Sequence, residues 1–459
     1  MKTLVIIGAG FSGAVTAAQF LHHSPPDTRV VLINRSGAMA RGLAYGTNSS
    51  LHLLNVPAGN MSAYVDDPEH FLRFCQARDS DCVASSFVPR KIYGDYLANV
   101  LDEAEKQSRR NVRLERVISE VESLREDGVG AVVELSNGLQ INADKVVLAF
   151  GNFSPLDPPG FDSLLSTHRY QSDPWSGSMR PLDDEESPVL LVGAGLTALD
   201  VTLSFLQQGH RGPIYMVSRR GLRPLPHRQQ RSSSETPSTV AEELLGVPPT
   251  ARGYLRVMRN EVNLAKLRDL DWRDVLAAMR LITPELWRRL PSIERQRFLR
   301  HVQPYWDIHR HRVAPAAYQR FNDAVLAGQI HLIAGRIRRV NEHVQGLMID
   351  IELRERSQFK QVLVTRAVNC TGPNTNLLRV NDRLIKQLRS DRLLTPDALN
   401  LGINVSESLA VKAANGKSST WLHYIGPMLK SELWEVTAVP ELRQHAKALA
   451  IRLAESMGI

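Results

Sequence analysis

The chain has 459 residues, of which 43% are hydrophobic and 23% are charged. This length allows two or three domains, the composition is typical of a soluble globular protein, and the sequence has no apolar run of about eighteen residues that would predict a membrane span. A net charge of +8 could indicate nucleic-acid binding, but many basic side chains gather in two short clusters, which fit a phosphorylated cofactor, an acidic substrate or simply a solvated basic face. The clusters are Arg219, Arg220, Arg223, Arg228 and Arg231, and His301, His309, Arg310, His311 and Arg312. We expect neither a nucleic-acid nor a membrane partner.

The cysteines exclude two further classes. Cys75, Cys82 and Cys370 form no Cys-x-x-Cys pair, which argues against a disulfide reductase, and they lack the nearby partners of a metal site. The first apolar strand begins at Leu4, which leaves no room for a signal peptide. We therefore expect a cytoplasmic protein without a metal.

The first recognisable unit spans residues 4–17, LVIIGAGFSGAVTA. It predicts a strand (4–7), a Gly-x-Gly-x-x-Gly turn and a helix (13–22), followed by a second strand (29–33). Gly8 allows the tight turn, Gly10 lets the backbone approach a pyrophosphate, and Gly13 keeps the helix close to the strand. The alternative is a glycine turn in an ordinary α/β crossover.

A carboxylate normally ends the second strand of such a unit and binds ribose hydroxyls. Here the position is held by Asn34, followed by Arg35. An amide both donates and accepts hydrogen bonds, so ribose binding stays possible.

The next segment predicts strands at 112–121 and 131–136, joined through a turn at Asp127-Gly128, and a hairpin turn at Asn137-Gly138. Residues 143–152, ADKVVLAFGN, predict an apolar strand that ends in Gly151 and returns to the first sheet. Its counterpart is TRAVNCTGP at 365–373, with Gly372 in the matching place. Such paired exits are typical of crossings between two dinucleotide-binding domains, although two ordinary buried strands would look the same.

Residues 189–202, VLLVGAGLTALDVT, repeat the glycine unit with Gly193, Gly195 and Ala198. The pattern predicts a strand (189–192), a helix (196–207) and a strand (214–217). Two such units in one chain imply two dinucleotides, one of which passes electrons to the other. The second unit ends in Ser218-Arg219-Arg220, and because arginine pairs bidentately with a phosphate, this site is predicted to select NADPH.

The remaining elements follow in order. Residues 232–240 predict a polar surface loop, 240–327 a helix-rich insertion, and strands resume from Gln329. Residues 438–456 predict a closing amphipathic helix. Its positive end could face a flavin, or the helix could simply complete the packing.

Five further segments carry a resemblance to a known group. They are RGLAYGTNSSLHLLNVPAGNMSA (41–63), PRKIYGDYL (89–97), VSRRGLRPLPHR (217–228), WDIHRHRVAP (306–315) and GPMLKSELWEVTAVPELRQHA (426–446). With the two glycine units, they are similar to two-dinucleotide flavoproteins, and within these to bacterial FAD/NAD(P)-binding oxidoreductases related to nitrosuccinate-synthase-type N-monooxygenases.

The resemblance implies an α/β fold with two Rossmann-like domains, one for FAD and one for NADPH, and a helical insertion. It places FAD on residues 1–160 and 365–459, and NADPH on residues 161–364, with the insertion at about 235–327. The implied FAD contacts are Gly8, Gly10, Phe11, Ser12, Gly13, Asn34, Arg35, Asn55, Met61, Gly151 and Gly426. The implied NADPH contacts are Gly193, Gly195, Thr197, Ser218, Arg219 and Arg220. Gly426 is followed by Pro427, where related flavoproteins have a carboxylate.

Three functions stay open. The first is an NADPH-reduced, FAD-dependent monooxygenase that hydroxylates an amine or amino-acid-like substrate. In this hypothesis the substrate is anchored by His309, Arg310, His311 and Arg312. The alternative is that these four residues tie the insertion to its parent domain. The second is a flavin-dependent reductase or dehydrogenase that passes electrons to another acceptor, and the third is a redox sensor without turnover. No Gly-x-Ser-x-Gly or His-Glu-x-x-His motif indicates a hydrolase. The catalytic residues, the oligomeric state and the small-molecule substrate itself are not fixed by the sequence.

Overall fold

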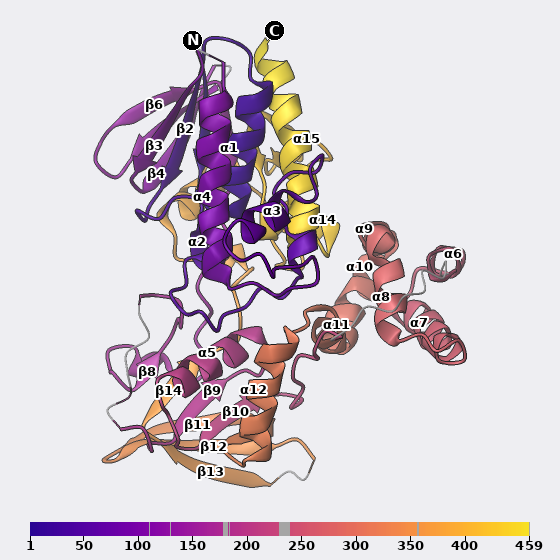
Figure 1. Ribbon diagram of the computed structural model, residues 1–459. Coiled ribbons are helices and arrows are strands. Elements are labelled where there is room, and N and C mark those ends of the chain that lie inside the picture. The colour runs from indigo at the N-terminus through magenta and orange to yellow at the C-terminus, as the bar shows by residue number, and fades with distance from the viewer. Residues whose placement is uncertain are drawn as a thin grey trace.

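The computed structural model describes residues 1–109, 111–128, 130–177, 182, 184–228, 239–355 and 358–458. Figure 1 shows two α/β bodies, one above the other, with both termini at the far end of the upper body and a lobe of helices beside the connection between them. Arg231 and most of the predicted polar loop at 232–240 lie outside the described residues.

The first body is built on a six-stranded sheet of order β15-β16-β7-β1-β2-β3, which is parallel except for β15. Its strands are β1 (Lys2–Ile7), β2 (Thr28–Asn34), β3 (Arg113–Ile118), β7 (Lys145–Leu148), β15 (Ala410–Lys412) and β16 (Ser418–Tyr424). Its long helices are α1 (Phe11–His23), α4 (Arg90–Gln107) and α15 (Val439–Gly458), and α1 packs against the other two. The apolar run of β1 is fully buried from Leu4 to Ile6, as a central parallel strand requires.

Smaller elements complete this body. A separate antiparallel sheet holds β4 (Val121–Asp127), β5 (Gly130–Leu135) and β6 (Gln140–Ala143), and short helices are α2 (Gly42–Tyr45), α3 (His70–Gln76), α13 (Arg383–Ser390) and α14 (Lys430–Leu433). The predicted single strand at 112–121 is therefore wrong: β3 pairs with β2, and the chain then leaves the parallel sheet to start β4. The alternation of apolar and polar residues in segment 112–121 could not reveal that the chain changes its strand partner.

The second body is a seven-stranded sheet of order β13-β12-β11-β10-β9-β14-β8, flanked by α5 (Leu196–Gln207) and α12 (Pro315–Leu326). The strands are β8 (Tyr170–Gln171), β9 (Val189–Val192), β10 (Ile214–Ser218), β11 (Ile330–His343), β12 (Gly346–Leu353), β13 (Phe359–Val364) and β14 (Arg366–Asn369). The sheet is parallel from β11 to β8, and β12 and β13 add an antiparallel meander. The second glycine unit falls where the sequence predicted it.

The helical insertion leaves the second body after β10 and returns to it before α12. Its helices are α6 (Val240–Gly246), α7 (Ala251–Lys266), α8 (Trp272–Ala278), α9 (Thr283–Arg289), α10 (Ser292–Arg297) and α11 (Gln303–Arg310). Within the insertion, Arg280–Ile282 forms a single 3-10 turn and Phe298–Val302 a π-helical turn. Elsewhere in the chain, single 3-10 turns lie at Ala58–Asn60, Asp162–Leu164, Leu377–Arg379 and Pro427–Leu429. The insertion has a small core of its own, which includes Val240, Leu244 and Val257.

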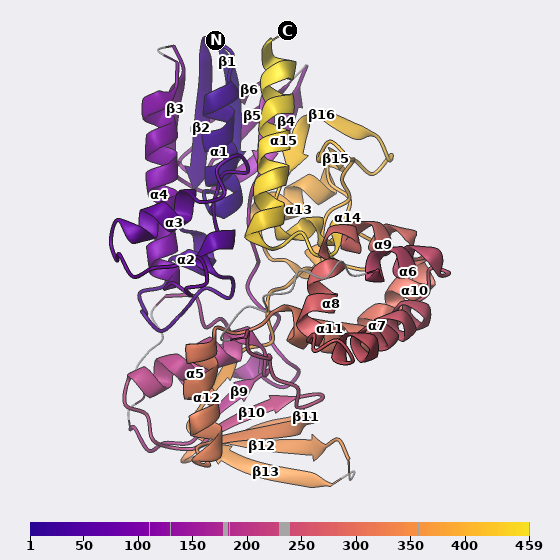
Figure 2. The same cartoon turned by 45° about the vertical axis from the view of Figure 1, so that its right-hand side comes forward.

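The insertion docks on the first body, although the chain connects it to the second. Figure 2 shows its ring of helices next to α14. The indole ring of Trp287 stacks on that of Trp434, with 4.6 Å between centroids, and its Nε1 donates to the carbonyl of Ser431 at 2.8 Å. The lobe therefore bridges the two bodies.

A second bridge joins the bodies directly. Arg90, the first residue of α4, pairs with Asp200 of α5 at 2.8 Å, and their side chains are only 16% and 7% exposed. His52 donates from Nε2 to the carbonyl of Asp200 and lies 2.9 Å from the hydroxyl of Ser204. In the part of the chain that the structure describes, no helix has the length and apolar character needed to span a membrane.

Candidate functional site

The glycines of the first turn are required by the backbone. Gly8 has φ +103°, and a Cβ there would lie 2.7 Å from the carbonyl oxygen of Ala149, at the end of β7. A Cβ on Gly13 would lie 1.8 Å from the carbonyl oxygen of Gly8. The glycines thus bring α1 against the sheet at the carboxyl ends of β1 and β7.

The N-terminus of α1 is open to an anion. Gly10 caps the helix without a side-chain hydrogen bond, and the first turn holds no acidic residue. The first amide with a partner on the preceding turn is that of Ala14, which donates to Gly10. The N–H groups of Phe11, Ser12 and Gly13 can therefore receive a pyrophosphate, as FAD binding requires.

Asn34 ends β2 beside this turn. Its Nδ2 donates to the carbonyls of Ser36 and Ala38, which orders the loop after the strand. The amide oxygen stays available to accept a ribose hydroxyl. Arg35 is exposed and lies 3.8 Å from Asp382, the N-cap of α13.

The second turn repeats the first. Gly193 has φ +121°, and a Cβ there would lie 2.4 Å from the carbonyl oxygen of Cys370, just beyond β14. Gly195 caps α5 without a side-chain bond, and Thr197 lies in its open first turn. The paired strand exits predicted from the sequence are therefore equivalent: β7 lies beside β1 and β14 beside β9.

The predicted selectivity residues follow β10. Ser218 ends the strand, and its hydroxyl accepts from the amide of Gly221. Arg219 is exposed. Arg220 instead donates to the carbonyls of Arg300 and His301 in the π-helical turn. Arg219 is thus the freer cation for a phosphate.

Two other predicted glycine loops meet beside the first turn. Gly426 has φ +147°, and a Cβ there would lie 2.6 Å from the hydroxyl of Tyr424 and 3.1 Å from the carbonyl of Phe150. Tyr424 donates to that carbonyl. Gly151 is exposed and adjoins this contact, but β7 ends at Leu148, three residues earlier than the strand predicted to end in Gly151.

The segment after α2 reaches the second body. His227 donates from Nε2 to the carbonyl oxygen of Asn55 at 2.9 Å. Burial and the nearby Arg312 lower the pKa of His227 to about 4, so the ring is neutral at pH 7. Met61 is buried in the first body's core. Asn55 therefore lies where both bodies and the insertion come together.

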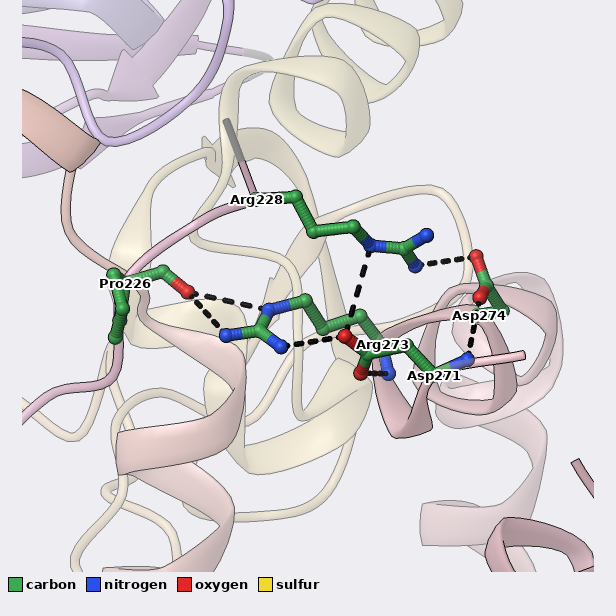
Figure 3. Close-up of polar contacts among 5 residues, drawn as sticks. All are labelled: Pro226, Arg228, Asp271, Arg273 and Asp274. Carbon is green, nitrogen blue, oxygen red and sulfur yellow. Dashed lines mark hydrogen bonds and ion pairs between the residues drawn. The ribbon is translucent and has the colours of Figure 1, made fainter. Parts of the chain in front are cut away.

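The insertion is joined through two segments that we call the neck, residues 223–228 and 308–313. They pair through the bridge Pro226–Val313 and the hydrogen bonds of Leu225 and His227. Figure 3 shows a polar cluster at this point: Arg228 pairs with Asp274 at 2.5 Å, and Arg273 pairs with Asp271 at 2.7 Å and donates to the carbonyl of Pro226. These ion pairs and the hydrogen bond to Pro226 attach α8 to the neck.

The four residues predicted to anchor a substrate have different surroundings. Arg310 pairs with Glu435 at 2.8 Å, so it ties the insertion to the first body and not to its parent second body, as the alternative had it. His309 lies edge-on to Trp272, with 4.8 Å between centroids, and its Nδ1 lies 2.7 Å from the carbonyl of Tyr305. His311, 3.8 Å from Asp307, has its pKa lowered by burial.

Arg312 is the fourth. Its guanidinium lies 5.9 Å from the centre of the Trp272 ring, and its Nε is buried with no hydrogen-bond partner among the described residues.

Sequence reasoning missed the acidic partners. Glu435 is 5% exposed and accepts from Trp306 at 2.7 Å as well as from Arg310. The missed pair Arg90–Asp200 joins positions 110 residues apart, and no local spacing indicates such a contact. The sequence does place the acidic Glu435 next to Trp434 in a segment with several apolar residues, and this position is the signal that could have indicated a buried acidic partner.

Two of the three cysteines, Cys75 and Cys82, lie close enough together to interact. Burial and the neighbouring Cys82 thiol raise the pKa of Cys75 to about 12. Burial also raises the pKa of Cys370. All three are free and buried, and the raised pKa values make the Cys75 and Cys370 thiols poor nucleophiles at neutral pH. Among the described residues, no group of three His, Cys, Asp or Glu side chains could hold a metal.

The two glycine turns, each at the carboxyl end of a parallel sheet, define the fold of a two-dinucleotide-binding flavoprotein. Residues 5–153 match a family model described as FAD-NAD(P)-binding. A search of the curated proteins gives no match. The fold class predicted from the sequence is confirmed.

Solved structures of this fold cover nearly the whole chain. The reduced form of ornithine hydroxylase from Pseudomonas aeruginosa is 12% identical, with a TM-score of 0.65 and 100% of both chains covered. Ornithine N-hydroxylase from Kutzneria sp. 744, with reduced FAD, NADP+ and L-ornithine, is 14% identical, with a TM-score of 0.62 and 99% of both chains covered. L-lysine 6-monooxygenase from Pseudomonas syringae is 14% identical, with a TM-score of 0.64 and 99% of both chains covered. At these identities the likeness concerns the fold.

Proposed function

We propose that the chain is an FAD-dependent oxidoreductase reduced by NADPH, and that it is a monooxygenase acting on an amine or amino-acid-like small molecule. The observation that carries the proposal is the pair of open helix N-termini at α1 and α5, each behind a glycine, Gly8 or Gly193, whose Cβ would collide with the neighbouring strand exit. The N-monooxygenases named above, with the same fold over the whole chain, support the finer reaction class.

The division of labour follows from the two bodies. We assign residues 1–160 and 365–459 to FAD and residues 161–364 to NADPH, with the insertion at about 235–327. Phe11, Ser12 and Gly13 would hold the FAD pyrophosphate through backbone N–H groups, and Asn34 its ribose. Gly195, Thr197 and Arg219 would hold NADPH. The three buried free thiols fit a reducing compartment, and we propose the cytoplasm.

When bound, FAD would supply the hydride-accepting and oxygen chemistry. The chain's own contribution is placement. The buried pair Arg90–Asp200 holds the two bodies together, so that two rings can meet in a fixed geometry. The insertion is fastened at the neck and to Glu435.

The test is a coupling experiment on the purified flavin-loaded protein. NADPH oxidation, oxygen uptake and hydrogen peroxide are measured with a panel of amines and amino acids. A monooxygenase shows a substrate whose addition speeds oxygen uptake while peroxide stays low and a hydroxylated product forms. NADPH oxidation that needs a quinone or protein acceptor, and that no amine stimulates, would replace the proposal with a reductase. Flavin that NADPH never reduces would indicate a sensor.

A further inference from the structure

The basic residues at the neck are not equally neutralised. Arg228 pairs with Asp274 and also lies near Asp271, and Arg273 pairs with Asp271, as Figure 3 shows. Arg310 has Glu435. Arg312 has no ion pair within 4 Å among the described residues, and its Nε is buried without a partner. Arg312 is therefore left without a counter-charge in the described part of the chain, and so is Arg223 of the neck, whose Nη1 is also buried without a partner.

The charges around Arg312 raise the free-energy cost of leaving its guanidinium without a counter-charge. Burial, and then Arg310, Arg273 and Arg228, lower the pKa of its guanidinium to about 10, although Asp271 acts in the other direction. A dehydrated cation among other cations is destabilising unless an anion completes the site. The neighbouring Arg310 also has a buried Nη2 without a partner in the described chain.

The position of Arg312 connects it with the proposed reaction site. Among the charged groups that act on His227, Arg312 has the largest effect, and His227 donates to the backbone of Asn55. Asn55 is one of the FAD contacts that the resemblance implies. Arg312 therefore lies near enough to His227 to act on its charge, and His227 in turn contacts a predicted FAD-binding residue.

We propose that Arg312 binds a carboxylate of the small-molecule substrate. A guanidinium pairs with a carboxylate through two parallel N–H groups, and the free Nε is one member of such a pair. The 2′-phosphate of NADPH is another source of negative charge, but the exposed Arg219 already follows β10 where that phosphate is expected. The inference rests on the proposed function for the identity of the ligand, but the site can be tested without turnover.

The first experiment measures anion binding by the purified full chain. Thermal unfolding is followed with acetate, glycine or inorganic phosphate, at constant ionic strength maintained with sodium chloride. The variants are Arg312→Gln, Arg312→Lys and, as a matched control, Arg259→Gln, which removes an exposed arginine of α7 in the same insertion. We expect acetate and glycine to stabilise wild type and the control, and apparent affinity to fall about tenfold to a hundredfold in Arg312→Gln. Arg312→Lys, which keeps the charge but loses the fork, should fall between them.

A second measurement needs no variant. Phenylglyoxal modifies accessible arginines, and peptide mass spectrometry reports the extent at each one. Acetate should slow modification of Arg312 in wild type and leave Arg259 unchanged. This keeps the proposal testable if Arg312→Gln does not fold.

The outcomes separate the two proposals. Equal stabilisation by acetate in all variants, or no protection of Arg312, overturns the inference even if the protein hydroxylates an amine. A loss of NADP+ affinity in Arg312→Gln with no acetate effect in wild type also overturns it, because the anion is then the cofactor's phosphate. Arg312-dependent acetate binding in a protein that never couples NADPH to oxygen leaves the anion site standing and removes the monooxygenase.

Discussion

The ion pair between the bodies should be the most sensitive point of the interface. Replacing Arg90 by methionine keeps much of the side-chain volume but leaves Asp200 buried without its partner. The charged atoms are 2.8 Å apart, and neither side chain is more than a third exposed, so solvent screens the pair little. Removing one partner of such a pair costs about 3–5 kcal/mol. Loss of the Arg90 Nε bond to the carbonyl of Leu53 adds about 1 kcal/mol.

The assay is urea unfolding of the flavin-loaded protein, followed by far-UV circular dichroism and flavin fluorescence, with free energies taken only where the two transitions coincide. The double variant Arg90→Met/Asp200→Leu removes both charges and should recover most of the loss, because a buried ion pair can often be replaced by apolar groups. Flavin reduction at saturating NADPH should slow by about tenfold in the single variant as the bodies lose their fixed placement. A double variant no more stable than the single one would refute the reasoning.

Further changes test separate parts of the site. Gly13→Ala should abolish flavin retention, since its Cβ would lie 1.8 Å from the carbonyl oxygen of Gly8, whereas Gly246→Ala, with open space around it, should retain full flavin content after purification. Arg219→Ala should cut the preference for NADPH over NADH, measured as a ratio of kcat/KM values, by about tenfold to a hundredfold; an unchanged ratio would assign selectivity elsewhere. The pKa of His227 is lowered to about 4 in the folded protein, so between about pH 6.5 and 4 only the unfolded state binds the proton, and the free energy of unfolding falls as pH falls through this window. His227→Gln should flatten the dependence of the unfolding free energy on pH in that window, and identical pH profiles for wild type and variant would contradict the assignment. A variant with all three cysteines replaced by serine should keep NADPH-driven flavin reduction, and a folded, flavin-bearing variant without it would show that a thiol takes part.

The two glycine units could be predicted from the sequence because their chemistry is local. Each places a strand, a turn and a helix within about fifteen residues, and the turn needs glycine at positions that the sequence shows directly. The strand bounds 189–192 and the helix bounds 196–207 follow from that pattern, and the structure has the same bounds. The division into an FAD part and an NADPH part stays a prediction.

Pairings between distant segments could not be predicted in this way. Nothing near Arg310 in the sequence indicates Glu435, and nothing near Arg90 indicates Asp200. The same limit explains the strand at 112–121: residues 113–118 pair with β2, the chain then leaves that sheet, and Val121 already pairs with β5.

The insertion shows why the chain order is a poor guide to its role. It is continuous with the second body, yet its ion pairs from Arg280 to Glu441 and from Arg310 to Glu435 attach it to the C-terminal segment of the first. A rotation of one body against the other would have to break these pairs together with the buried pair of Arg90. Since Arg312 follows Arg310 by two residues, the same fastening that holds the bodies also fixes the proposed carboxylate site relative to Asn55. Under the proposed function, substrate selection and cofactor placement would therefore depend on one set of contacts, and loosening Glu435 should weaken both.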